Sequence, residues 1–198
     1  ASRDLGWAES ALDEARATLE ARGDRINAAH ARYLEIRRLV LIGRLDAAER
    51  LLGLLDPAPL PSALRAAHGL VAAGIAMRRR QTKAARAALE AASRAAKCAG
   101  SPALSAEVES ALHSLETPAA RLIVRGTERA LLLEEVERVL ASDALIVDAC
   151  RYELRERGVV ISLARRPVLF ALARTLGESW PGDAHRAALI AQAFGGKH

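Results

Sequence analysis

Apolar residues recur at helical spacing over the first 116 residues, with charged residues on the positions between them. Leu5, Leu12 and Leu19 share one helix face, for example, and Gly23 ends that stripe. The pattern predicts a run of short amphipathic helices. The first ends at Gly23, the second at Gly43 and the third at the proline-rich run 56–61, and three more span about 62–79, 82–98 and 103–116.

Beyond Thr117-Pro118 the pattern changes to short, β-branched runs. Residues 121–126 predict a strand and residues 132–140 a helix, and we expect this segment to complete a sheet with the strands that follow. Those strands are predicted at 145–147, 150–155 and 159–163, with the charged residues 156–158 forming the turn of a hairpin.

Helical spacing returns near the end of the chain. One helix is predicted from about Arg166 to Ser179, with Pro167 in its first turn, where the missing N–H has no partner to lose. Residues 180–183 break it. A second helix follows, with Leu189, Ile190, Ala193 and Phe194 on one face and Gly195-Gly196 at its end. We expect Phe194 to belong to the core.

An internal repeat underlies the first half. Leu12-Asp13-x-Ala15-x-x-x-Leu19 aligns with Leu45-Asp46-x-Ala48-x-x-x-Leu52 and, less closely, with Thr82-Lys83-x-Ala85-x-x-x-Leu89, at offsets of 33 and 37 residues. This arrangement resembles divergent tetratricopeptide repeats, although the tryptophan and most aromatics of that family are absent. The resemblance implies a solenoid of helical hairpins with the three alanines buried at helix crossings. Helical hairpins without repeat ancestry remain the alternative.

The last quarter carries a second resemblance. Leu163-Ala164-Arg165-Arg166, then Pro181-Gly182, then His185-Arg186-x-x-Leu189-Ile190-x-x-x-Phe194-Gly195, is similar to the DNA-binding domain of OmpR/PhoB-type winged-helix regulators. Ala164 stands where that family has threonine, and the turn before the second helix is one residue shorter. The family's recognition helix and wing would follow His198. Because the chain also opens on Ala1 rather than Met, we expect it to be a fragment of a longer protein.

The expected fold is therefore mainly α. Antiparallel helical hairpins, a tetratricopeptide-like solenoid, occupy residues 1–117, and a small α+β winged-helix-like domain without its recognition helix occupies residues 118–198.

Composition adds a basic bias and few aromatics. The chain carries a net charge of +5, and only 3% of its residues are aromatic. This balance permits nucleic-acid binding, although an arginine-rich composition explains part of it. Cys98 and Cys150 are isolated, which fits a reducing cytoplasm. No apolar run has the roughly 20 residues that a membrane span needs, so no membrane association is expected.

Patterns typical of catalysis are missing. The five histidines are scattered, without metal-ligand spacing. Glu134-Glu135 is most simply a solvated pair on a helix, and Arg125-Gly126-Thr127 is a turn rather than a phosphate loop. We therefore expect no enzyme, no catalytic residue, no cofactor and no metal site.

The basic residues are the candidates for contacts. Arg78-Arg79-Arg80 closes a helix, where cations favour the negative end of the dipole, so capping is preferred over phosphate binding there. Arg165 and Arg166 open a helix, where a cation gains nothing from the helix dipole. Two explanations for their position remain, a contact with phosphate or chance in an arginine-rich chain. His185 and Arg186 open the next helix, whose free N–H groups suit a phosphate oxygen. With Lys197, these are the expected DNA-binding residues, on one exposed face.

The sequence thus predicts part of a bacterial DNA-binding transcriptional regulator. The winged helix would contact double-stranded DNA, weakly in this chain, while the helical repeats dock a protein or peptide partner or support a homodimer. The alternative is a non-enzymatic protein-interaction or dimerisation module whose winged-helix-like end is structural.

Overall fold

The computed structural model describes residues 9–195 of the 198-residue chain. The chain divides into two compact units between Glu116 and Thr117. The described part is mainly helical and carries small antiparallel sheets after residue 117, as the sequence predicts for the fold class.

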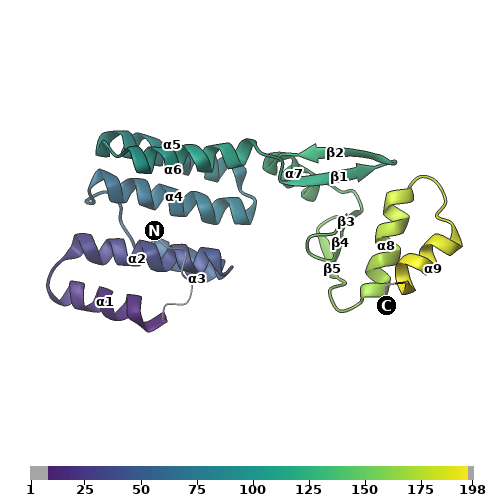
Figure 1. Ribbon diagram of the computed structural model, residues 1–198, viewed down its shortest axis with the longest axis horizontal. Coiled ribbons are helices and arrows are strands. Elements are labelled where there is room, and N and C mark those ends of the chain that lie inside the picture. Colours follow the sequence, from purple (N-terminus) through teal and green to yellow (C-terminus); the bar gives the residue numbers. More distant parts are fainter. Residues whose placement is uncertain (1–8, 196–198) are drawn as a thin grey trace. The chain divides into compact units, whose positions relative to one another are not determined.

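The first unit is a stack of helices (Figure 1). Its elements are α1 (Glu9–Ala21), α2 (Arg25–Leu41), α3 (Leu45–Gly53), α4 (Ser62–Arg79), α5 (Thr82–Ala99) and α6 (Pro102–Glu116). α1 packs on α2, α2 on α4 and α4 on α5; α3 lies against α2 and α4, and α6 against α4 and α5. α4 is therefore the central helix of this unit.

Three of the helix connections use the same left-handed turn. Gly23 (φ +71°), Gly43 (φ +79°) and Arg80 (φ 59°) follow α1, α2 and α4, and the residue after each donates its N–H back to the helix, as in Arg44 N–H to Leu39 O at 2.9 Å. These are Schellman-type ends, which satisfy the last carbonyls of a helix and reverse the chain. Asp24 then caps α2 by accepting the N–H of Asn27 at 3.1 Å.

The closest helix contact joins α4 and α5. A Cβ added at Gly69 on α4 would lie 2.8 Å from the Ala88 carbonyl oxygen and 2.8 Å from the Ala92 Cβ on α5. Alanines line much of this contact, with Ala66, Ala92 and Ala96 fully buried in one cluster against which Leu70 of α4 packs. Only glycine and alanine allow two helix backbones to approach this closely.

Larger side chains fill the other side of α4. Tyr33 and Ile36 of α2, Ala48 of α3 and Val71 and Ile75 of α4 form one buried cluster. Ala48 and Ala85 are thus buried as the repeat predicts, but the prediction for Ala15 is wrong, because Ala15 is exposed. The reason is that α1 packs mainly against α2, which covers a single face of α1.

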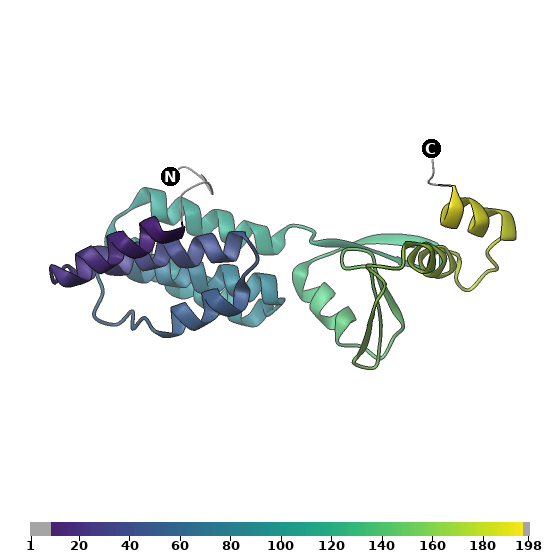
Figure 2. The same cartoon turned by 90° about the horizontal axis from the view of Figure 1, so that it is seen from below.

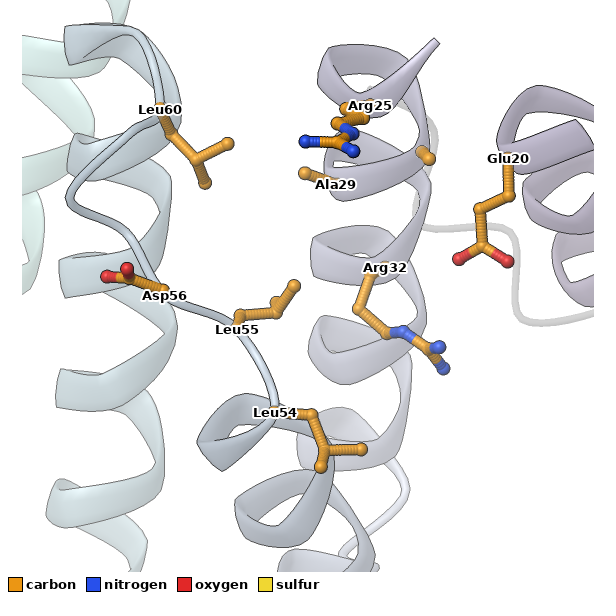
Figure 3. Close-up of a pocket in the computed structure, with 9 residues that line it drawn as sticks. Glu20, Arg25, Ala29, Arg32, Leu54, Leu55, Asp56 and Leu60 are labelled. Atoms are coloured by element: carbon orange, nitrogen blue, oxygen red, sulfur yellow. The ribbon is translucent and has the colours of Figure 1, made fainter. Parts of the chain in front are cut away.

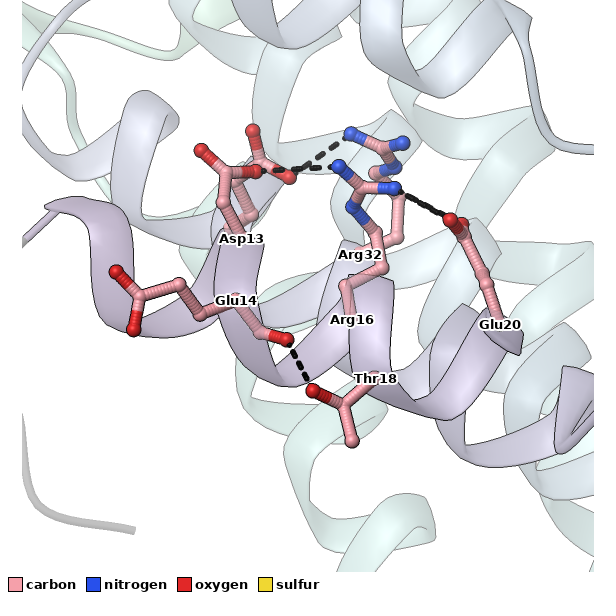
Figure 4. A network of polar contacts seen from close by, with 7 residues as sticks. Asp13, Glu14, Arg16, Thr18, Glu20 and Arg32 are labelled. Atoms are coloured by element: carbon pink, nitrogen blue, oxygen red, sulfur yellow. Dashed lines mark hydrogen bonds and ion pairs between the residues drawn. The ribbon is translucent and has the colours of Figure 1, made fainter. Parts of the chain in front are cut away.

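Ion pairs join helices that are distant in sequence. Arg79 at the end of α4 contacts Asp46 and Glu49 on α3, the latter at 3.2 Å, and Arg37 of α2 contacts Glu107 of α6. Within α1, Arg16 pairs with Asp13 at 3.4 Å and Glu20 at 2.8 Å (Figure 4). Such exposed pairs contribute little energy each, but they occupy the arginines that take part in them.

The second unit contains two separate antiparallel sheets, seen from below in Figure 2. Its elements are β1 (Ala120–Val124), β2 (Thr127–Leu131), α7 (Leu133–Leu140), β3 (Ile146–Asp148), β4 (Glu153–Glu156), β5 (Val159–Ser162), α8 (Pro167–Ser179) and α9 (Arg186–Phe194). β1 pairs with β2, and the other sheet has the order β3-β4-β5.

Two expectations for this region are corrected. β2 is an additional strand, and the β1–β2 hairpin does not complete the sheet of β3 to β5. Cys150 and Arg151 lie in a turn before β4, where both N–H groups donate to Asp148 Oδ1, at 3.0 and 3.2 Å.

The predicted turn at 156–158 is present. Arg157 and Gly158 both have positive φ, as do Arg125 and Gly126, which is the two-residue hairpin geometry that matches strand twist.

This unit has a thin core. Among its described residues, Leu131, Leu163 and Phe170 are buried, and the Phe170 ring packs on that of Tyr152 with centroids 4.7 Å apart. Phe194, expected in the core, is 65% exposed, because α9 packs mainly against α8 and Phe194 lies off that contact. All four residues of the edge strand β5 are exposed as well.

The α4–α5 crossing yields a stability prediction. Gly69→Ala should lower the free energy of unfolding by about 1–3 kcal/mol, because the added methyl meets backbone and forces the helices apart. Gly74→Ala in the same helix is the matched control, since its Cβ would meet only Val40 Cγ1, at 3.8 Å. That change should stabilise by about 0.5–1 kcal/mol through helix propensity. Urea unfolding measures both, and equal effects would contradict a steric limit at Gly69.

Candidate DNA-contact and partner-docking sites

Arg165 and Arg166 lie in the tight connection from β5 to α8. The Arg166 N–H donates to Leu163 O at 2.8 Å, and the Arg166 carbonyl accepts the N–H of Phe170 at 3.0 Å, which begins the helix. Because Leu163 is buried, it anchors this turn and leaves both arginine side chains exposed to solvent. Two guanidinium groups are thus presented at the start of α8.

His185 and Arg186 open α9. His185 is the N-cap, with its carbonyl accepting the N–H of Leu189 at 3.1 Å, and its side chain makes no capping bond. Both side chains are exposed. The first N–H groups of α9 are therefore open to an anion, and Arg186 is the first residue of the helix.

The structure does not bring these two pairs together, so the expected single face is wrong. α8 is about 20 Å long at 1.5 Å per residue, and α9 follows its far end after residues 180–185. Figure 1 shows the starts of the two helices well apart. Lys197, the fifth expected contact, lies outside the described residues.

The arginine triplet at the end of α4 divides by role. Arg79 is held by Asp46 and Glu49 of α3, and the hydrogen bond that Arg79 donates to Asp46 raises the pKa of Arg79 and lowers the pKa of Asp46. Arg78 is exposed, and Arg80 adopts the left-handed turn that leads into α5. For Arg79 a structural role is therefore clear.

A cleft of about 280 Å³ was not anticipated from the sequence. It lies between the end of α1, the start of α2 and the loop that joins α3 to α4 (Figure 3). Leu54, Leu55 and Leu60 of that loop form its apolar side, opposite Ala28 and Ala29 of α2. Leu54 is 74% exposed, so the cleft offers apolar surface to solvent.

Four charged groups line the same cleft, and most are already paired. Arg32 bonds Glu35 at 3.0 Å, Glu20 accepts from Arg16, and Asp56 Oδ1 accepts the N–H of Ala58 at 2.9 Å. Figure 3 shows the Arg25 guanidinium turned towards the leucine-bearing loop. Among the described lining residues, Arg25 is thus the cation left available to a ligand.

Behind the cleft, Tyr33 and His68 connect α2 to α4. The Tyr33 hydroxyl lies 3.2 Å from His68 Nδ1, and the rings meet edge to face with centroids 5.8 Å apart. Burial raises the pKa of Tyr33 to about 12. Burial also lowers the pKa of His68, with Asp56 acting in the opposite direction. The pair joins α2 to α4 through a ring contact and a polar contact.

Within residues 9–195, no three His, Cys, Asp or Glu side chains cluster closely enough to hold a metal ion. In the same residues, no helix combines the length and apolarity that crossing a membrane requires.

Comparisons with protein-family models, with curated proteins and with solved structures found no match for this chain.

Protonation of His68 should make stability pH-dependent. The pKa of His68 is lower in the folded chain, so as the pH falls through 6.5 the unfolded chain binds a proton before the folded chain does. The free energy of unfolding therefore decreases as the pH falls, until the pH is below the pKa of His68 in the folded chain. His68→Gln keeps a polar partner for Tyr33 but cannot titrate. Urea unfolding between pH 7.5 and 5.5 should therefore show a smaller loss for this variant, and parallel losses would exclude His68 as the source.

Proposed function

We propose that this chain is part of a DNA-binding transcriptional regulator. Residues 117–198 would contact double-stranded DNA as a winged-helix-like domain, and the helices of the first unit would dock a protein or peptide partner as a tetratricopeptide-like solenoid. The observation that carries the proposal is the order of elements around α9. A three-stranded antiparallel sheet, a helix, a turn and a second helix that opens on exposed His185 and Arg186 follow one another.

Physical chemistry supports a phosphate contact at the start of α9. Free helix N–H groups and the positive end of the helix dipole favour an anion, and a guanidinium adds a charge-assisted bond. Contacts of this kind position a protein on DNA without reading sequence. Arg165 and Arg166 would form a second phosphate contact at the start of α8, separate from the first.

The helices of the first unit favour a docking role. The cleft beside α2 combines three leucines with the available cation of Arg25, which suits a peptide that carries an apolar side chain next to a carboxylate. Small concave sites with a few polar groups are where such ligands bind.

The alternative is a non-enzymatic interaction or dimerisation module. It is favoured by exposed apolar side chains on α8 and α9 and the turn between them, where Leu176, Trp180, Ile190 and Phe194 are each at least half exposed. An exposed apolar patch of this kind marks an interaction site. A homodimer formed through it would need no DNA contact.

Salt-dependent binding distinguishes these functions. Fluorescence anisotropy with a labelled random-sequence duplex should show weak binding. The slope of the logarithm of the binding constant against the logarithm of the salt concentration should decrease in magnitude by about one for Arg186→Ala and by about one for Arg166→Ala, because each change removes one phosphate contact. Arg174→Ala is the control, because that arginine is bonded to Glu178 at 2.7 Å. No DNA binding at low salt, or an unchanged slope in the Arg166 and Arg186 double variant, would favour the interaction module.

A further inference from the structure

The outward face of α5 carries a narrow basic stripe. Lys83, Arg86, Arg94 and Lys97 are all exposed, and Glu90 is the carboxylate between them (Figure 1 shows the helix). At 100° per residue, the four cations fall within an arc of about 80° on the side opposite the α4 contact. We call these four side chains the α5 stripe.

The α5 stripe differs from the four paired arginines of the first unit. Arg16, Arg32, Arg37 and Arg79 each pair with a carboxylate, three of them with side chains at least two-thirds buried. In the described part of the chain, the four side chains of the α5 stripe are exposed and have neither a hydrogen bond nor an ion pair. Like charges at i and i+3 repel, as for Lys83 and Arg86 and for Arg94 and Lys97, and Lys83 also stands at the unfavourable end of the helix dipole. Glu90, four residues from both Arg86 and Arg94, offsets part of this repulsion, and Lys97 lies at the favourable end of the dipole, so these charges contribute little net energy to folding.

The shape of this face favours phosphates over a protein partner. The exposed residues between the cations are small, among them Ala84, Ala87 and Ala91, and the one large apolar side chain of α5, Leu89, is fully buried. Protein interfaces depend on large side chains that fill pockets in the partner, and this face offers no apolar anchor. Binding driven by cations alone is what the nucleic-acid backbone permits.

The spacing along the helix also fits a duplex. The two cation pairs are centred about 16 Å apart along the axis, at 1.5 Å per residue. The major groove of B-DNA is about 12 Å wide, so long side chains at both ends reach the phosphates that border it. Glu90 then lies over the groove, between the two rows of phosphates.

We propose that the α5 stripe binds the phosphate backbone of double-stranded DNA, which gives the first unit a DNA contact of its own. The inference rests on the proposed function, since it adds a second contact surface to a DNA-binding chain. The helical unit would then add affinity without reading sequence, and the cleft beside α2 would stay free for a protein partner.

Salt dependence tests the α5 stripe directly. The variant Lys83→Gln, Arg86→Gln, Arg94→Gln and Lys97→Gln should bind a labelled random-sequence duplex more than about tenfold more weakly at low salt, with a log–log salt slope smaller by about three to four. The matched control replaces Arg22, Arg50, Arg65 and Arg78 by Gln. All four are exposed in the same unit, so the control changes net charge equally. Circular dichroism melts verify that both variants fold.

Each outcome separates the two proposals. A slope reduced equally in the two quadruple variants would overturn the α5 stripe, because net charge alone would then explain the effect. Loss of the slope in the α5 variant, with no change in the Arg166 and Arg186 double variant, would support the stripe and count against the winged-helix contact. Tighter binding of poly-glutamate than of the duplex, lost in the α5 variant, would overturn DNA as the occupant in favour of an acidic protein.

Discussion

The close approach of α4 and α5 at Gly69 determines how the rest of the first unit packs. Because a side chain at Gly69 would meet the α5 backbone, glycine permits the close approach at this point, while Val71 and Ile75 of α4 pack on the other side with Tyr33 and Ile36 of α2. α3 and α6 then occupy the grooves that remain beside α4. A crossing lined with small residues gains its stability from many dispersion contacts at short range rather than from a few large side chains.

That geometry also determines where charge can be neutralised. Arg79 at the end of α4 reaches Asp46 and Glu49 because α3 lies against the same helix, and Arg37 reaches Glu107 because α6 packs next to α4. On α5, Ala85, Leu89 and Ala92 are buried, whereas the long side chains of the α5 stripe are exposed and form no ion pair within the described part of the chain. The α5 stripe therefore lies on the face of α5 opposite the face that packs against α4 near Gly69.

Helix positions were predictable from the sequence because they depend on local chemistry. Gly23, Gly43 and the prolines before α4 mark helix ends through backbone conformation, which needs no knowledge of neighbours. The exposure of Ala15 was not predictable, because it depends on which helices cover α1. β2 was missed because its first four residues, with Glu128 and Arg129 adjacent, are exposed and show no alternation of apolar and polar positions. The cleft was missed because it joins three segments between residues 20 and 60.

The candidate DNA contacts illustrate the same limit. Sequence order placed Arg166 and Arg186 at helix starts, and the structure confirms those positions, but order alone does not say whether two helix starts are neighbours. Since α9 begins where α8 ends, a rigid α8 separates the two contacts by its own length. Two separated phosphate contacts constrain orientation on a duplex better than two adjacent ones, because a single contact leaves rotation about it free. The core around Phe170 is thin, and α8 and α9 expose apolar side chains such as Leu176 and Ile190. If these helices contact DNA, a partner that covers those side chains would also affect how the two helices are oriented.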